Sequence, residues 1–80
     1  ELKVYPNPAS DVVFIEFLAN INEDNDINIM DVTGHLIDKR HMHYKSGKFQ
    51  LDVSDLSAGA YFIEIIDNSG TRKVSKFIKE

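Results

Sequence analysis

The sequence AYFIEII at residues 60–66 decides the fold class of this 80-residue chain. Side chains on a β-strand alternate between two faces, so Tyr61, Ile63 and Ile65 share one face of this segment. The segment consists mainly of β-branched and aromatic residues, which favour a strand. It therefore predicts a strand with one face in the core.

Six further segments carry the same strand signal. In residues 11–18, DVVFIEFL, the apolar positions 13, 15 and 17 share a face. In residues 26–30, DINIM, Ile27 and Ile29 point inward. The other expected strands cover residues 2–5, 36–44, 48–51 and 71–78. Seven short strands in one small chain predict an all-β fold, a compact seven-stranded immunoglobulin-like (Ig-like) β-sandwich.

Turn-forming residues separate the expected strands. Pro6 and Pro8 lack N–H donors, so they cannot continue a central strand and set a stiff bend. Polar or hairpin turns are expected at residues 22–25, 33–34, 46–47 and 68–70. We expect at most one helical turn, over residues 53–58, with Asp52 or Ser54 as its cap.

Composition excludes several classes of protein. The chain has 9 basic and 13 acidic residues, and this net charge of −4 argues against a general nucleic-acid binder. It has no cysteine, so a disulfide framework and a cysteine zinc site are excluded. No apolar run approaches the roughly 20 residues that span a bilayer. Because the chain starts without Met or a signal peptide, we expect residues 1–80 to be a single domain from a longer precursor.

Charge is divided unevenly along the chain. Residues 71–80 hold four basic groups and one acidic group, a net of +3, whereas residues 1–70 hold 5 basic and 12 acidic groups, a net of −7. The basic groups of this tail are Arg72, Lys73, Lys76 and Lys79. The tail is read either as a site for an anionic partner or as an edge strand protected by lysines, and β-augmentation or a strand-mediated homodimer stays open.

Metal binding is one alternative function. His41 and His43 lie two residues apart and share a strand face, with His35 nearby, so imidazoles could bind zinc or copper. Residues 23–26 could offer oxygens to calcium, but the spacing of a calcium loop is absent. An exposed polar strand face and a solvated turn explain both groups, and we expect no cofactor.

Catalysis and sugar binding are two further alternatives. Ser10, Ser54 and Ser57 lack a nucleophile-elbow pattern, and Asp52 and Asp55 are explained as turn caps. We therefore expect no enzymatic activity. An aromatic sugar platform would draw on Tyr5, Phe14, Phe49, Tyr61 and Phe62. Aromatic residues at strand spacing are usually core, although Phe14 and Phe62 lie on the opposite parity and would mark a contact surface if both were exposed.

Four motifs in order closely resemble the C-terminal sorting domain, type A, of the type IX (Por) secretion system of Bacteroidetes. The opening motif YPNPAS contains Tyr5, Pro6, Asn7 and Pro8. The hairpin motif contains Asp31 and Gly34. The third motif, in residues 51–62, contains Leu51, Asp52, Leu56, Gly59 and Tyr61. The closing basic-apolar segment supplies the candidates for recognition by the translocon, Arg72, Lys73, Val74, Lys76, Phe77, Ile78 and Lys79.

The resemblance implies a secretion signal. Such a domain follows a cargo protein, crosses the periplasm, and is read by the type IX translocon and its outer-membrane shuttle and sortase proteins. A sortase usually removes it, and the cargo is attached to the cell surface or released. The alternatives are a retained domain of a machine component, and an Ig-like adhesion or carbohydrate-binding module.

The motifs also have physical reasons within the fold. Gly34 suits a turn position with positive φ. Leu51, Leu56 and Tyr61 can anchor a tight loop on the core, while Asp52 satisfies its backbone. Gly59 would let the chain re-enter the sheet. The recognisable residues are therefore expected to shape the fold, and the surface that they shape would carry recognition.

Overall fold

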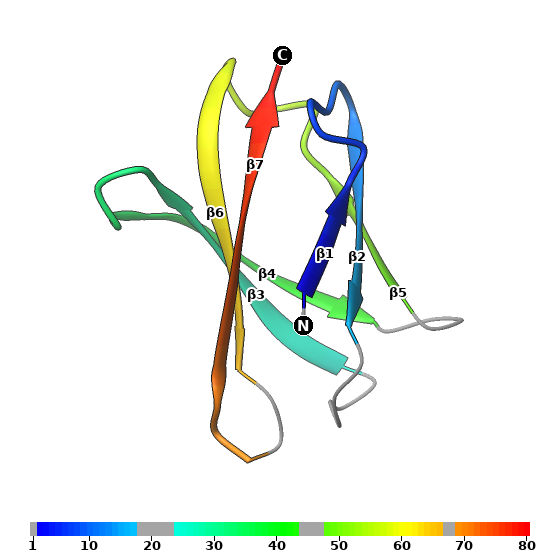
Figure 1. The fold of residues 1–80 in the computed structure, drawn as a ribbon, viewed down its shortest axis with the longest axis vertical. Helices are drawn as coiled ribbons and strands as arrows, with labels where there is room; N and C mark the ends of the chain where they lie inside the picture. Colours follow the sequence, from blue (N-terminus) through cyan, green and yellow to red (C-terminus); the bar gives the residue numbers. More distant parts are fainter. Residues whose placement is uncertain (1, 18–23, 44–47, 67–68) are drawn as a thin grey trace.

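The computed structural model describes residues 2–17, 24–43, 48–66 and 69–80, which form seven β-strands (Figure 1). The strands are β1 (Leu2–Tyr5), β2 (Val12–Phe17), β3 (Asp24–Asp31), β4 (Leu36–His43), β5 (Lys48–Asp52), β6 (Gly59–Ile66) and β7 (Arg72–Lys79). Every expected strand is therefore confirmed, with ends that shift by one or two residues.

The strands form two antiparallel sheets that pack face to face. One sheet has the order β1-β2-β5, and the other has the order β4-β3-β6-β7. In Figure 1 the three-stranded sheet lies on the right, and the turn between β3 and β4 projects to the left, away from it. The expected all-β sandwich is confirmed.

The core lies between the two sheets and is built from the predicted alternation. Tyr61, Ile63 and Ile65 of β6 are buried, as are Ile27 and Ile29 of β3. The opposite sheet contributes the buried side chains of Val13, Ile15, Phe49 and Leu51. The side chain of Phe17, which was expected inward, lies outside the described residues. Burying one such aliphatic or aromatic side chain contributes about 1.5–3 kcal/mol, so the alternating pattern supplies the main stabilisation.

Two of the expected turns need correction. Asp24 and Asn25 belong to strand β3 and not to a polar turn, because both pair with β4. Residues 53–58 form no helical turn. Instead, the Leu56 N–H donates to the Val53 carbonyl at 3.0 Å, which closes a β-turn. The expected turn residues 22–23, 46–47 and 68 lie outside the described part of the chain.

Strand β7 lies at the edge of the four-stranded sheet, and its last residues meet the chain near its start. Ala9 forms an isolated parallel bridge with Lys79. Strands β1 and β7 are also in contact, so the first and last strands lie side by side (Figure 1). No helix among the described residues is long and apolar enough to cross a membrane.

Candidate recognition site

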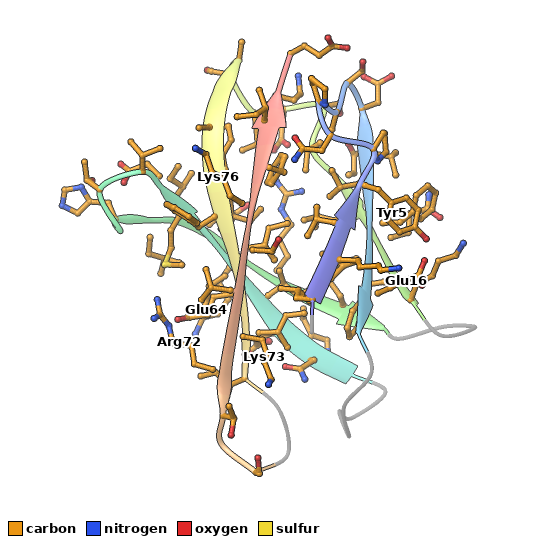
Figure 2. The ribbon with its side chains drawn as sticks, viewed as in Figure 1. Tyr5, Glu16, Glu64, Arg72, Lys73 and Lys76 are labelled. Carbon is orange, nitrogen blue, oxygen red and sulfur yellow. The ribbon has the colours of Figure 1, made fainter. Side chains whose placement is uncertain are left out.

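The basic tail is a strand whose side chains divide between two sides. Figure 2 shows Arg72 and Lys76 on the side of β7 that faces away from the three-stranded sheet, and Lys73 on the other side. Alternation puts Val74 and Ile78 with Arg72 and Lys76, and all four are exposed. The tail therefore presents alternating basic and apolar side chains on one outer face.

Phe77 is a tail residue whose side chain lies in the core and not on the surface. Its side chain is fully buried, and its ring stacks on Tyr61 with 5.6 Å between the ring centroids. A partner of the folded domain therefore cannot contact Phe77 directly.

Arg72 lies on the outer face in an ion pair with Glu64. The Arg72 Nε donates to Glu64 Oε2, and the Asn28 amide Nδ2 donates to Glu64 Oε1 at 2.7 Å. These hydrogen bonds, the one from Arg72 first, hold the pKa of the Glu64 carboxyl below its ordinary value. Glu64 is only 13% exposed, so it neutralises Arg72 from beneath, while the Arg72 side chain itself is 60% exposed.

The opening motif holds the end of the last strand. The Ile78 N–H donates to Asn7 Oδ1 at 2.8 Å, and the Ala9 N–H donates to the Ile78 carbonyl at 2.8 Å. The Glu80 N–H donates to the Ala9 carbonyl at 2.9 Å. The YPNPAS motif and the basic tail, at opposite ends of the sequence, are therefore joined by three hydrogen bonds.

Tyr5 lies on the outer face of the three-stranded sheet. Its hydroxyl donates to Glu16 Oε2, and this hydrogen bond is the main cause that raises the pKa of the Tyr5 phenol. Its ring packs on Phe14 with 5.7 Å between centroids, and the Lys48 ammonium lies 4.8 Å from the centre of the Phe14 ring. Tyr5 therefore fixes the chain in front of the two prolines of its motif.

Asp31 organises the hairpin motif. Its Oδ1 accepts hydrogen bonds from the Thr33 N–H, the Thr33 hydroxyl and the His35 N–H at 2.9, 2.6 and 3.0 Å. These contacts, the Thr33 hydroxyl first, lower the pKa of Asp31. Gly34 has φ +89°, the positive value that the motif predicts.

In the third motif, as in the hairpin motif, an aspartate accepts hydrogen bonds from the N–H and hydroxyl of the residue two positions later. Asp52 Oδ1 accepts from the Ser54 hydroxyl at 2.6 Å and the Ser54 N–H at 2.9 Å, and these bonds lower the pKa of Asp52. Leu51 is buried and Leu56 packs against the core. The Tyr61 hydroxyl donates to the Ser57 carbonyl at 2.6 Å. This loop is therefore anchored on the core as expected.

Gly59 completes that motif at the start of β6. Its φ of +153° belongs to the region that L side chains rarely adopt, and no atom beyond its two chain neighbours lies within 4 Å of an added Cβ. Backbone conformation therefore accounts for a glycine here, at the point where the chain re-enters the sheet.

Arg40 is a structural residue on β4, the strand for which an exposed polar face was expected. Its side chain is only 19% exposed, and its Nη2 donates to the Asp55 carboxylate at 3.0 Å. Its Nη1 donates to the Asp52 carbonyl, and its Nε donates to Asp38 at 2.9 Å. Arg40 thereby joins β4 of one sheet to the end of β5 in the other.

The histidines and acidic residues do not gather into a metal site in the described structure. His35 lies 3.7 Å from Asp31, and His41 lies 3.0 Å from Asp26, so the two histidines belong to separate pairs. No group of three potential ligands is close enough to hold a metal ion within residues 2–17, 24–43, 48–66 and 69–80. The side chain of His43 and the whole of Glu23 lie outside the described part.

The aromatic residues do not form one platform. Phe49 and Tyr61 are buried in the core. Phe14 and Phe62 are both half-buried, and they lie on the outer faces of different sheets. The condition for one contact surface containing both Phe14 and Phe62 is therefore not met.

Comparisons with known proteins agree with this arrangement. A family model described as "Secretion system C-terminal sorting domain" matches residues 3–80. No curated protein matches the chain. Two solved structures are also similar to this chain. Both are less than 25% identical to it, so the similarity is evidence for the fold alone.

A DUF3244 family protein with an immunoglobulin-like β-sandwich fold from Bacteroides vulgatus is 17% identical, with a TM-score of 0.68. The match covers 99% of this chain and 84% of that chain. CopC from Methylosinus trichosporium is 19% identical, with a TM-score of 0.57 and coverage of 99% and 82%. The sandwich is therefore Ig-like, as expected.

Proposed function

The chain belongs to the family of secretion system C-terminal sorting domains, and from this premise we propose that it is the signal by which the type IX machinery exports a cargo protein. The family match over residues 3–80 is the observation that carries the proposal. A sorting signal of this kind implies export to the outer membrane or cell surface. It points to a role in recognition, without enzymatic activity of the domain itself.

The finer steps of the proposal follow the family resemblance. The cargo precedes residues 1–80 in one precursor and reaches the periplasm by a separate signal. The translocon and its shuttle proteins then read the folded domain at the outer membrane. A sortase removes the domain, and the cargo is attached to the surface or released.

The tail is the part of the domain that we propose for recognition. Arg72, Val74, Lys76 and Ile78 are exposed together on one side of β7, which supports contact with a partner. The other motifs would act by shaping this strand. In particular, Asn7 and Ala9 hydrogen-bond to its end.

The experiment that tests the proposal is a reporter fused in front of residues 1–80. We expect the reporter at the cell surface or in the medium only in a host that has the type IX machinery. The same fusion in a host without this machinery is the control and should stay in the periplasm. Retention in the periplasm of both hosts would refute the proposal.

A second experiment separates charge from fold. Deleting residues 71–80 would remove β7 and the buried Phe77, so loss of export would not distinguish recognition from unfolding. Alanine in place of the four tail cations, at 72, 73, 76 and 79, should reduce export while the domain stays folded. Alanine in place of Lys3, Lys39 and Lys48, three cations outside the tail, is the control. Unchanged export by the tail variant would mean that the tail charges only protect the edge strand.

A further inference from the structure

Exposed apolar side chains gather on the outer face of the four-stranded sheet. Val32 and Leu36 are 59% and 58% exposed, and Val74 and Ile78 are 39% and 37% exposed. The buried Met30 (8% exposed) and the half-buried Phe62 are direct partners in the ladder between β3 and β6 and connect these residues. We call this group the outer patch: Met30, Val32, Leu36, Phe62, Val74 and Ile78.

Strand register explains how the outer patch is assembled. Met30 pairs with Leu36 on one side and with Phe62 on the other, and Phe62 pairs with Lys76. The patch therefore runs across all four strands of the sheet. Exposed apolar side chains that gather on one face of a small domain indicate a site of interaction.

The outer patch contains a hollow where two of the sequence motifs meet. An open hollow of about 300 Å³ is lined by Met30, Val32, Thr33, Gly34, Phe62, Arg72 and Val74. The hairpin motif supplies one side of it, and the basic tail supplies the other. Interfaces are dominated by a few side chains that fill pockets, and this hollow has the size for one such anchor.

A cation without a local counterion lies beside the apolar side chains. Arg72 is neutralised by Glu64, but Lys76 has no acidic partner in the described structure. Its ladder partner is Phe62, at the middle of the outer patch. Charge complementarity therefore favours a partner with a carboxylate next to an apolar side chain.

The charges disfavour two other occupants of the patch. A second copy docked by the same face would bring Lys76 and Arg72 of both copies to one interface, without a free acidic group on the patch to meet them. An anionic membrane would be opposed by the rest of the domain, where residues 1–70 carry a net charge of −7.

The free edge of β7 is also less suitable than the face. At its end the edge is closed by Asn7 and Ala9, and β1 lies next to it. An added strand could pair only with the part of β7 before Ile78. The outer patch, in contrast, is open along the length of the strand.

We propose that the outer patch is the docking surface for an acidic protein partner, which inserts one apolar side chain into the hollow between Phe62 and Val74 and sets a carboxylate beside Lys76. The inference rests on the proposed function, so the partner is a component of the secretion machinery. The face of the sheet, rather than the edge of β7, is then the surface that is read.

Substitutions in the reporter fusion test this inference. Val74→Asp puts a negative charge at the hollow, and Lys76→Glu reverses the charge at position 76. Both positions are exposed, so neither substitution buries a charge in the core. We expect each variant to lower surface reporter about tenfold, and Lys76→Ala to have a smaller effect. Lys3→Glu on the other sheet is the matched charge control, and Val74→Met preserves the apolar contact, so both should be exported like the parent chain.

The outcomes separate the two proposals. Melting temperatures of the purified fusions identify any variant that has lost its fold. Lys76→Glu breaks no ion pair or side-chain hydrogen bond of the described structure, so it keeps the test decisive. If the parent chain is exported and both patch variants are exported equally well, the docking surface is refuted and the sorting function stands. If the parent chain itself is not exported, the sorting function fails and the inference fails with it.

Two measurements on the purified 80-residue chain test the other occupants. Sedimentation that shows a dimer which Val74→Asp dissociates would assign the patch to a second copy. Binding to phosphatidylglycerol vesicles that Lys76→Glu abolishes would assign it to an anionic membrane. Either result would overturn the proposal, whereas a monomer that does not bind the vesicles supports it.

Discussion

Asn7 Oδ1 accepts a hydrogen bond from the backbone N–H of Ile78 at 2.8 Å, across a separation of 71 residues in the chain. Together with the two hydrogen bonds of Ala9, this contact joins the opening motif to the last strand. Asn7, between the two prolines, therefore does more than form a bend in the chain. It satisfies a donor on the outer edge of β7, where no strand of the described structure is hydrogen-bonded to β7 in a sheet.

Removing the acceptor at position 7 should loosen the end of β7. We expect Asn7→Leu to lower the free energy of unfolding by about 1–2 kcal/mol, because the Ile78 N–H loses its partner. Asn7→Asp keeps an acceptor oxygen and is the matched control. Amide hydrogen exchange at Ile78 should accelerate in the leucine variant alone, and equal exchange in both variants would contradict this role.

The alternation of apolar residues was sufficient to predict the strands and the core, but not the contacts between distant segments. Tyr61, Ile63 and Ile65 are buried as their spacing requires. The contact of Asn7 with Ile78 depends on which strands become neighbours, and local pattern carries no such information. The sequence therefore predicts the bend at the two prolines, but it does not predict that Asn7 holds the end of β7.

Strand β4 shows a second limit of the sequence. Its sequence, LIDKRHMH, has no apolar face, so alternation could not indicate which side chains point inward. The pairing of β3 with β4 also shifts in register between Ile29 and Met30, so the alternation in the sequence does not give the pairing of β4 residues directly. Only the packed structure shows that Arg40, between the exposed Lys39 and His41, crosses to the other sheet.

Arg40 should contribute strongly to stability. It closes the side of the sandwich where β4 meets β5, and its donors serve the Asp52 carbonyl and the carboxylates of Asp38 and Asp55. We expect Arg40→Met to lower the free energy of unfolding by about 2 kcal/mol, since hydrogen bonds to charged groups are lost. Urea unfolding measures the change. Lys39→Met, at the exposed neighbouring position, is the control and should change stability by no more than about 0.5 kcal/mol.

Gly34 should be required for its backbone conformation and not for space. Its φ is +89°, and no atom beyond its two chain neighbours lies within 4 Å of an added Cβ. We expect Gly34→Ala to cost about 1–2 kcal/mol through backbone strain. Gly34→Asn should cost less, because asparagine tolerates positive φ better. Thermal unfolding compares the variants, and equal stability of the alanine variant and the parent chain would contradict the argument.

The pair of Glu64 and Arg72 should make stability depend on pH. Arg72 and then Asn28 lower the pKa of Glu64 below the ordinary 4.5, so the folded state favours the ionised carboxylate. A group with a lowered folded pKa stabilises the fold above its unfolded pKa and loses this effect as pH falls through the folded pKa. The contribution of Glu64 is therefore complete at neutral pH and disappears in acid.

Glu64→Gln isolates this contribution from the other carboxylates. Asp31, Asp38 and Asp52 also have lowered pKa values, but they are present in both chains and cancel in the difference. We expect the free energy of unfolding of the parent chain to exceed that of the variant by a constant amount from neutral pH to about pH 5. This difference should shrink below about pH 4.5, the ordinary pKa of the carboxyl. Urea titrations over this range measure the difference. A gap that stays constant down to about pH 3 would mean that the Arg72 pair does not hold the carboxylate ionised.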